Sequence, residues 1–491
     1  AQRFQRITKS FTDPVQMTRA DSLFLDGDFS AAANALESLL AADPTDPVLL
    51  HNRGLLEMLL GEGSGLSRFQ HAYALAPDAG FLSWRLGCAL TEEGLLTEGE
   101  QYLARAAKRA DLYEAAVDLG RNLRLQGRFE EAVKATRRAF GQDRTYVRAY
   151  VELFRDYIAL GDSSAALNTL RRGYVRFPYE ELLGELVGFW RGRGEADSLA
   201  AYAEEYLRTY PKGPRLDEVL AALAWARPDT LYEAGDYPDN APYPVSRAPE
   251  DDRGMPDGLR IKYNVRWSIF KLGTLTVDVR PGVYRGEPTW RAQYVARSGL
   301  PFVALTDTFR AQLDRRLRHT VRMDMFYHEK GLVSVKTYEN DYRTGWSEVR
   351  VVFGGNWWLY DAHPLPPSAF DATSQLWFAR RLVLQRRSGT AVCEISRGFE
   401  KTFINILGPD RKTFRIGEEV VGTIKIDGIM RYAGIAGLTG DYVGWFADDY
   451  RGWPLKAKFK IFLGWVTIIF DRVEPTPMPP GETWHTRGDN R

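Results

Sequence analysis

The sequence has few of the residues that build disulfide frameworks and metal centres. Cys88 and Cys393 are its only cysteines among 491 residues, they stand far apart in apolar surroundings, and there are six histidines. A disulfide framework is therefore excluded, and both cysteines are expected to be buried as small hydrophobic residues. No two histidines have the spacing of metal ligands on a helix, so neither a metal site nor a cofactor is predicted.

An excess of charge of one sign and long apolar runs are also missing. Lys and Arg total 65 against 64 for Asp and Glu, a formal net charge of +1. A protein that relies on long-range attraction to nucleic acid shows a clear excess of positive charge, so nucleic acid is not expected as a partner. The longest apolar run, residues 461–470, has about half the length that spans a bilayer, and no transmembrane helix is expected.

Fingerprints of common enzymes are absent as well. The sequence has no G-x-S-x-G elbow, no phosphate-binding P-loop and no dinucleotide motif, and an enzyme is not predicted. The acid pair Asp448 and Asp449 could serve acid–base chemistry together with Asp371. The interpretation we favour is a turn between strands, where aspartates commonly accept hydrogen bonds from the backbone. An enzyme of an unrecognised type stays open as an alternative.

The first half of the sequence contains a repeat. Glycines recur at intervals of 33 or 34 residues, at Gly27, Gly61, Gly94, Gly127, Gly161 and Gly194. Helix-length segments rich in Ala and Leu lie between them. A glycine at this period suits the tight turn between the two helices of a repeat, because it adopts the helix-ending conformation at little steric cost.

This period resembles that of tetratricopeptide repeats. The best single match is Leu119-Gly120-Arg121-Asn122-Leu123 followed by Gly127-Arg128-Phe129-Glu130-Glu131-Ala132. About six repeats with a capping helix would form an all-α superhelix over residues 13–226. The resemblance implies a concave surface that binds a protein partner.

Four residues near the middle of this expected surface are candidates for partner binding: Trp84, Arg121, Arg124 and Arg155. Arginines that point into a groove could hold an acidic peptide or a peptide carboxylate. The alternative is an arginine face that is simply solvated.

Residues 227–257 are rich in proline and acidic residues, which predicts an extended linker. From residue 258 the hydrophobic period becomes two, as where Leu259, Ile261, Tyr263 and Val265 alternate with polar residues. Roughly ten strands with one apolar face predict an antiparallel barrel or a highly curved sheet. Residues 476–491 are expected to form a tail.

One helix is expected inside this β-rich half. The stretch from Pro366 to Asp371 is typical of a helix start, with Ser368 as its N-cap. The apolar stripe of this helix, which could plug an open side of the sheet, would consist of Phe370, Trp377, Phe378 and Leu382.

Residues 258–475 resemble the bacterial family known as domain of unknown function 3108. The resemblance rests on the opening Tyr263-Asn264-Val265-Arg266-Trp267 and on the late motifs Phe446-Ala447-Asp448-Asp449-Tyr450-Arg451 and Pro454-Leu455-Lys456-Ala457. The residues that match the family pattern are Gly273, Asp371, Ser374, Arg380, Asp448, Asp449 and Pro454. The resemblance implies an envelope-associated protein with a β-barrel-like fold, and it brings no established activity.

Two features of the β-rich half suggest binding. If the first strand pairs with the last, a basic stripe would form from Arg260, Lys262, Arg266, Lys456, Lys458 and Lys460. Such a stripe would suit an anionic lipid or an acidic membrane complex, and the alternative is edge lysines that discourage aggregation. Inside the barrel a cavity for an apolar molecule could be lined by Met323, Met325, Trp267, Trp290, Trp346, Trp357, Trp358 and Trp465.

These observations together predict a non-enzymatic scaffold of the bacterial envelope. The sequence begins with Ala1-Gln2 and no methionine, which fits either removal of a signal peptide or a start trimmed by other means. We favour the first, so export to the periplasm is expected. The first alternative is a periplasmic carrier that holds a lipid or another apolar ligand in the barrel.

Overall fold

The structure is a computed structural model that describes residues 18–109, 112–142, 146–177, 179–227, 255–267, 270–299, 305–329, 332–353, 355–371, 373–395, 398–430, 440–461 and 464–475. The expected tail and nearly all of the expected linker lie outside these residues. The chain divides into two compact units. The first, called here the solenoid unit, comprises Ala1–Tyr202, Gly331–Lys336 and Val349–Asp361, and the second, the sheet unit, comprises Ala203–Lys330, Thr337–Glu348 and Ala362–Arg491.

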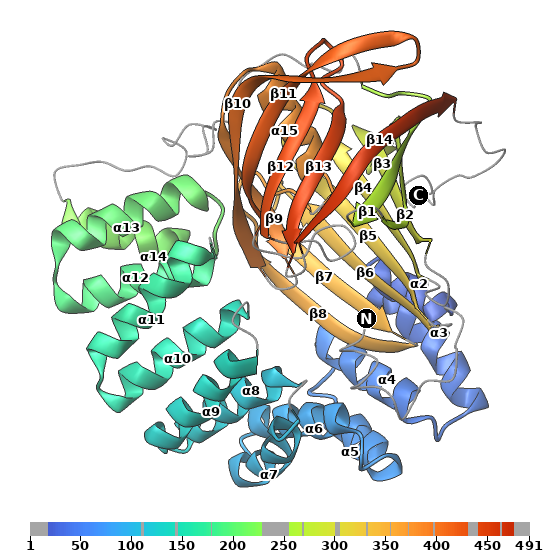
Figure 1. Cartoon of the computed structure of the whole chain (residues 1–491). Helices are drawn as coiled ribbons and strands as arrows, with labels where there is room; N and C mark the ends of the chain where they lie inside the picture. The colour runs from blue at the N-terminus through green and yellow to red at the C-terminus, as the bar shows by residue number, and fades with distance from the viewer. Residues whose placement is uncertain are drawn as a thin grey trace. The chain divides into compact units, whose positions relative to one another are not determined.

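The first half of the chain consists of paired helices (Figure 1). They are α2 (Arg19–Leu25), α3 (Phe29–Ala42), α4 (Pro47–Leu59), α5 (Leu66–Leu75), α6 (Gly80–Glu92), α7 (Leu96–Ala107), α8 (Tyr113–Leu125), α9 (Phe129–Gln142), α10 (Val147–Leu160), α11 (Ser163–Arg176), α12 (Glu180–Arg193), α13 (Ala196–Thr209) and α14 (Leu216–Ala226). All six repeat glycines have φ between 69° and 86°, the left-handed conformation that the period predicts. The helical half is a solenoid of helix pairs with the period and turns that are typical of tetratricopeptide repeats.

Close packing between paired helices explains other small residues of the repeat. A Cβ atom added to Gly120 on α8 would lie 2.0 Å from Thr136 Oγ1 on α9, and one added to Gly87 on α6 would lie 2.7 Å from Leu103 Cγ on α7. Leucines at the repeat period, such as Leu86, are buried in the layers between helices. The helices therefore approach closely where the side chain is smallest.

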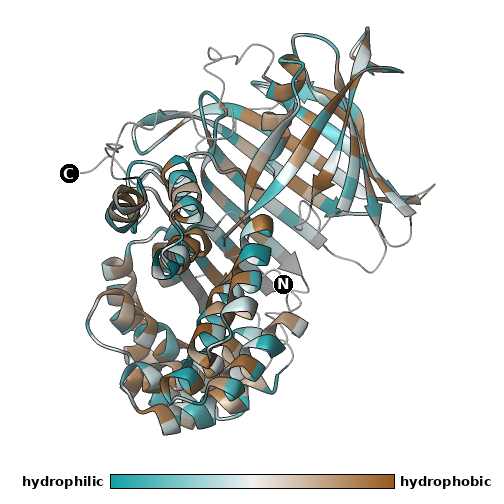
Figure 2. Ribbon diagram, turned by 90° about the vertical axis from the view of Figure 1, so that its left-hand side faces the viewer, coloured by the Kyte–Doolittle hydropathy of each residue, from teal (hydrophilic) through white to brown (hydrophobic). Residues whose placement is uncertain are grey.

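The second half forms an antiparallel sheet. Its strands are β1 (Leu259–Trp267), β2 (Phe270–Tyr284), β3 (Glu287–Ser298), β4 (Leu305–Asp314), β5 (Thr320–Glu329), β6 (Leu332–Asp341), β7 (Trp346–Phe353), β8 (Asn356–Pro364), β9 (Gly389–Ile395), β10 (Gly398–Ile416), β11 (Glu419–Met430), β12 (Gly440–Ala447), β13 (Pro454–Ile461) and β14 (Gly464–Pro475). The order is β8-β7-β6-β5-β4-β3-β2-β1-β14-β13-β12-β11-β10-β9. Figure 2 shows hydrophilic and hydrophobic residues alternating along these strands.

The first strand pairs with the last, as the basic-stripe hypothesis requires, since β1 and β14 are antiparallel neighbours. The sheet is nevertheless not closed into a barrel, because β8 and β9 form its two edges within the described residues. The segment between these two strands carries the helix α15 (Gln375–Leu384), around which the sheet curves in Figure 1. Phe378 and Leu382 of α15 share one buried cluster with Ile404, Ile426 and Phe446 of the sheet.

The start of this helix differs from the expectation. Ser374, rather than Ser368, is the N-cap of α15. Phe370 lies outside the helix, in an isolated bridge with Cys393, where its N–H donates to the carbonyl of Val392. Because the backbone of Phe370 is hydrogen-bonded in a strand-like bridge, it cannot adopt a helical conformation, and the helix begins only after Asp371. No helix of the described part of the chain is long and apolar enough to cross a membrane.

Candidate peptide-binding surface of the solenoid unit

Asn52 of α4 is the centre of a main-chain recognition site. Its amide is buried, with Nδ2 donating to the carbonyl oxygen of Gly355 at 2.7 Å and Oδ1 accepting from the N–H of Trp357 at 3.0 Å. On α6, Arg85 donates from Nη2 to the carbonyl oxygen of Trp358 at 2.9 Å. These contacts are to backbone groups of the turn residue Gly355, whose φ is 75°, and of the first residues of β8. Contacts to backbone groups are the pattern of a peptide-binding surface.

Two tryptophans anchor the segment beside these hydrogen bonds. The ring of Trp357 stacks on Phe24 with centroids 4.4 Å apart and an angle of 7°, and its Nε1 donates to Asp21 Oδ1 at 2.6 Å. Trp358 lies against Phe81 and Trp84, at centroid distances of 5.8 and 6.0 Å. Both tryptophans are buried, so the solenoid unit holds residues 355–358 through aromatic anchors and backbone bonds together.

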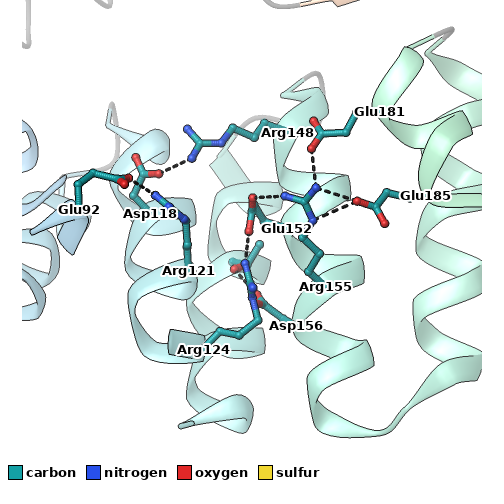
Figure 3. Close-up of polar contacts among 11 residues, drawn as sticks. Glu92, Asp118, Arg121, Arg124, Arg148, Glu152, Arg155, Asp156, Glu181 and Glu185 are labelled. Carbon is teal, nitrogen blue, oxygen red and sulfur yellow. Dashed lines mark hydrogen bonds and ion pairs between the residues drawn. The ribbon is translucent and has the colours of Figure 1, made fainter. Parts of the chain in front are cut away.

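The four predicted partner-binding residues lie on α6, α8 and α10, and the structure shows what each contacts. Trp84 is buried, and its Nε1 donates to Asp118 Oδ2 at 2.7 Å. Arg121, Arg124 and Arg155 take part in a row of ion pairs with carboxylates of the solenoid (Figure 3). None of the three arginines is simply solvated.

The row runs over α6, α8, α10 and α12, and its ion pairs can be followed in Figure 3. They are Arg121–Glu92 at 2.5 Å, Arg148–Asp118 at 2.8 Å, Arg124–Glu152 at 2.5 Å, Arg124–Asp156 at 2.9 Å, Arg155–Glu152 at 3.0 Å, Arg155–Glu181 at 2.7 Å and Arg155–Glu185 at 2.7 Å. Six carboxylates thus face four guanidinium groups. Burial alone would lower the pKa of Arg155, yet Glu181 and the neighbouring carboxylates raise it. The negative excess disfavours an acidic peptide as the partner of this row.

Sequence reasoning missed the acids of this row and the role of Trp357 and Trp358. A signal for the acids exists, because Asp118, Glu152 and Glu185 recur at intervals of 34 and 33 residues, the period of the repeat. Each of the first two is followed three residues later by an arginine on the same helix face. No pattern of this kind marks the two tryptophans, which lie in the β-rich half of the sequence.

The predicted basic stripe is only partly brought together. β14 lies between β1 and β13, and Arg266, Thr467 and Lys458 are in register on one face. Arg260 pairs with Asp278 at 3.0 Å and Lys262 with Glu474 at 2.7 Å, while Lys456 lies 5.4 Å from the ring centre of Trp445. Two cations of β1 are therefore paired with acids of the neighbouring strands β2 and β14, and the cations of the stripe without such partners among the described residues lie at the end of the strands where Arg266 and Lys460 are.

The residues that match the family pattern have structural contacts. Asp371 accepts hydrogen bonds from the N–H groups of Thr373 and Ser374 at 2.7 and 3.0 Å, and from Thr320 Oγ1 at 2.7 Å. A Cβ on Gly273 would lie 2.1 Å from the carbonyl oxygen of Arg297. Arg380 donates to the carbonyl oxygen of Arg451 at 2.6 Å, and the carbonyl oxygen of Pro454 accepts from Tyr263.

Asp448 and Asp449 do not act as a pair, because they contact different arginines. Asp448 accepts a hydrogen bond from Arg386. Asp449 accepts from the N–H of Arg451, two residues on, at 2.9 Å, and also contacts its guanidinium group. This is the geometry of an Asx turn between β12 and β13. The described part of the chain holds no cluster of three or more His, Cys, Asp or Glu residues that could bind a metal ion.

A buried histidine makes the solenoid unit sensitive to acid. Burial, with a contribution from Arg85, lowers the pKa of His51 to about 3. In the unfolded chain a histidine titrates near 6.5, so acidification to pH 5 protonates the unfolded chain and not the folded one. Stability is then complete above pH 6.5 and falls as the pH drops from 6.5 towards 3.

We expect the free energy of unfolding to fall by about 2 kcal/mol between pH 7 and pH 5 on account of His51. Urea unfolding at the two pH values measures it. The variant His51→Gln should show a smaller difference between them, whereas His71→Gln, at an exposed position of α5, should keep the wild-type difference. Equal pH dependence in both variants would contradict the assignment.

Comparisons with known proteins give solved structures that are similar to part of this chain. A crystal structure of MamA is 21% identical, covers 32% of this chain and 94% of its own, and has a TM-score of 0.30. The crystal structure of PilW, described as a widely conserved type IV pilus biogenesis factor, is 20% identical over 41% of this chain and 94% of its own, with a TM-score of 0.38. A tetratricopeptide repeat protein from Parabacteroides merdae is 14% identical over 42% and 81%, with a TM-score of 0.36.

Because these TM-scores are low, we assign the repeats from the glycine period and the turns of the chain itself and not from these structures. No protein-family model matches the chain, and no curated protein does. The resemblance of residues 258–475 to domain of unknown function 3108 therefore stays a prediction.

Proposed function

We propose that this chain is a non-enzymatic scaffold of the bacterial envelope whose solenoid surface binds an extended segment of a partner protein. The observation that carries the proposal is a pair of hydrogen bonds, one that the Asn52 amide donates to the carbonyl of Gly355 and one that it accepts from the N–H of Trp357. An amide that satisfies one carbonyl and one N–H of an extended chain accepts many sequences. Main-chain recognition of this kind is what an adaptor surface needs.

The partner segment would continue from the aromatic anchor sites towards the ion-pair row on α8, α10 and α12. Because the row carries more carboxylates than guanidinium groups, basic side chains on the partner would complement it. In this arrangement residues 355–358 of the chain itself occupy the part of the surface formed by α4 and α6. A partner that uses the same part must displace them.

The β-rich half would dock on a second component or a membrane surface. A lipid carrier is less favoured, because the cavity beneath α15 has a volume of only about 120 Å³. It is lined by residues such as Leu275, Ile404 and Phe446, and none of the expected tryptophans or Met323 and Met325 lines it. Sites that bury a drug-sized ligand measure roughly 300–1,000 Å³, so this one would hold a small apolar group at most. No contact of Asp371, Asp448 or Asp449 favours an enzyme.

A peptide of residues 349–361 tests the proposed surface. In the full chain, the double variant W357A/W358A vacates the anchor sites, and we expect it to bind the labelled peptide measurably by fluorescence anisotropy. Adding Asn52→Ala should weaken that binding by about tenfold or more, because two hydrogen bonds are lost. The matched control is a peptide with serine in place of both tryptophans, which should not bind.

If the double variant does not fold, hydrogen exchange in the otherwise wild-type chain answers the same question. Asn52→Ala should speed exchange of the Trp357 amide, whose acceptor is Asn52 Oδ1, more than that of amides within α10. Unchanged peptide affinity on loss of Asn52, or unchanged exchange of the Trp357 amide, would refute main-chain recognition at this site.

A further inference from the structure

One end of the sheet carries exposed aromatic side chains. Trp267 and Phe270 face each other across the β1–β2 hairpin, with ring centroids 6.4 Å apart, and Phe270 is 59% exposed. β14 begins beside them, because Trp267 is in register with Val466. The neighbouring Trp465 is 40% exposed.

The same end continues across the neighbouring strands. β13 ends at Ile461 opposite Gly464, and β11 ends at Met430 opposite Gly440, the first residue of β12. One residue further in, Ile429 of β11 faces Phe403 of β10, and both are exposed. We call these five residues, Trp267, Phe270, Phe403, Ile429 and Trp465, the aromatic end. It extends from β2 to β10 and includes both faces of the sheet, because Trp267 is in register with Val466 and the preceding residue, Trp465, points to the other face. Trp267 is half-buried and the other four side chains are exposed, and large apolar side chains gathered at one end of a sheet mark an interaction surface.

The opposite end of the same strands has a different character. Its turns carry charged residues: Arg285 between β2 and β3, Glu418 between β10 and β11, and Asp448 and Asp449 between β12 and β13. Most turns of soluble sheets look like this. Apolar side chains are exposed at this end too, Val283, Val420 and Tyr450 among them. The aromatic end is therefore distinguished by the facing rings of Trp267 and Phe270 and by the cations beside them, and not by exposure alone.

Cations lie beside the part of the aromatic end on β1, β2 and β14, whereas the acid Asp441 is directly opposite Ile429 on β11. Lys460 is directly opposite Trp465, and Arg266 is directly opposite Lys271. Across β14, Lys458 shares a face with Arg266. None of these four cations forms an ion pair with a residue that the structure describes. Aromatic side chains with lysines and arginines one or two residues away along the strand are typical of the boundary between lipid headgroups and acyl chains.

We propose that the aromatic end docks on the surface of an anionic lipid bilayer. The aromatic rings enter the headgroup region while the cations contact lipid phosphates, so that charge and apolar surface act together. This inference rests on the proposed docking role of the β-rich half and names its partner. It does not depend on peptide binding by the solenoid unit.

Flotation of the full chain with vesicles tests the proposal. Vesicles of phosphatidylglycerol and phosphatidylethanolamine in equal parts are compared with vesicles of phosphatidylcholine alone at low salt. We expect binding to the anionic vesicles only, decreasing as salt is added. K271E/K460E should lower the partition constant by about 25-fold or more, since each cation near an anionic surface is worth about fivefold. F270S/W465S should lower it by about tenfold.

Matched controls lie at the far end of the β10–β11 hairpin, where Arg415 is exposed and Val420 is 62% exposed. R415E and V420S should bind vesicles as the wild type does, and the melting temperatures of all variants show that they fold. Absence of binding to anionic vesicles, or equal losses in the control variants, would overturn the proposal. Asn52→Ala should leave vesicle binding unchanged, so failure of the peptide-binding function is seen separately from failure of docking.

Discussion

Replacing Trp357 with alanine is expected to lower the free energy of unfolding of the solenoid unit by about 3–5 kcal/mol. The side chain is fully buried, stacks on Phe24 and donates from Nε1 to Asp21. Its removal leaves a cavity, and it also leaves the buried carboxyl of Asp21 without one of its donors. Burial raises the pKa of that carboxyl. Because the site is shielded from solvent, water does not readily replace the lost hydrogen bond, and the unpaired oxygen costs free energy.

Urea unfolding followed by circular dichroism measures this change. Leu125→Ala on α8 is the matched control, because that large apolar side chain of the same unit is 51% exposed. We expect the control to change the free energy by about 0.5 kcal/mol or less. If Trp357→Ala is no more destabilising than the control, residues 349–361 do not belong to the solenoid unit.

Replacing Asp371 with alanine is expected to destabilise the sheet unit by a similar amount, about 3–5 kcal/mol. The carboxylate accepts from the backbone N–H groups of Thr373 and Ser374 at the start of α15, and from the hydroxyl of Thr320. Alanine leaves these donors buried and unpaired, and each unpaired donor costs roughly 1–3 kcal/mol. The position of α15 against the sheet depends on the same contacts.

The measurement is again urea unfolding, with hydrogen exchange of the α15 amides as a second readout. Asp441→Ala is the control, since Asp441 is exposed at the start of β12, and its loss should change stability by about 0.5 kcal/mol or less. Asp371→Asn should fall between the two, because an amide keeps one acceptor oxygen. A stable Asp371→Ala protein with an unchanged α15 would show that the carboxylate has no structural role and would revive an enzymatic one.

Much of the fold follows from short-range patterns in the sequence. The glycine period places the six turns inside the helix pairs, because the left-handed conformation is a property of one residue in its local setting. The alternation from Leu259 to Trp267 predicts β1 with the same bounds that the structure shows. Pairing of the first strand with the last is a condition of the basic-stripe hypothesis, which links it to closure of the barrel; the two strands pair, but the sheet stays open.

What the sequence could not predict depends on contacts between distant residues. Whether a sheet closes depends on the register of all its strands and on what fills its concave side, which here is α15. The start of that helix was misplaced because the bridge between Phe370 and Cys393 is invisible to a local capping pattern. The partners of Arg124 and Arg155 were missed for a related reason, since ion pairs across adjacent repeats appear only when the residues are aligned at the repeat period.

The hydrogen bond between Asp21 and Trp357 joins residues 336 positions apart. During synthesis at roughly 5–20 residues per second, the N-terminal helices would wait about 20–70 s before the residues that complete their packing leave the ribosome. In that interval Phe24, Phe81 and the Asn52 amide lack the partners described above. A chaperone that shields the nascent N-terminal repeats, or synthesis fast enough to shorten the delay, would therefore matter more for this chain than for a repeat protein whose units complete themselves in order.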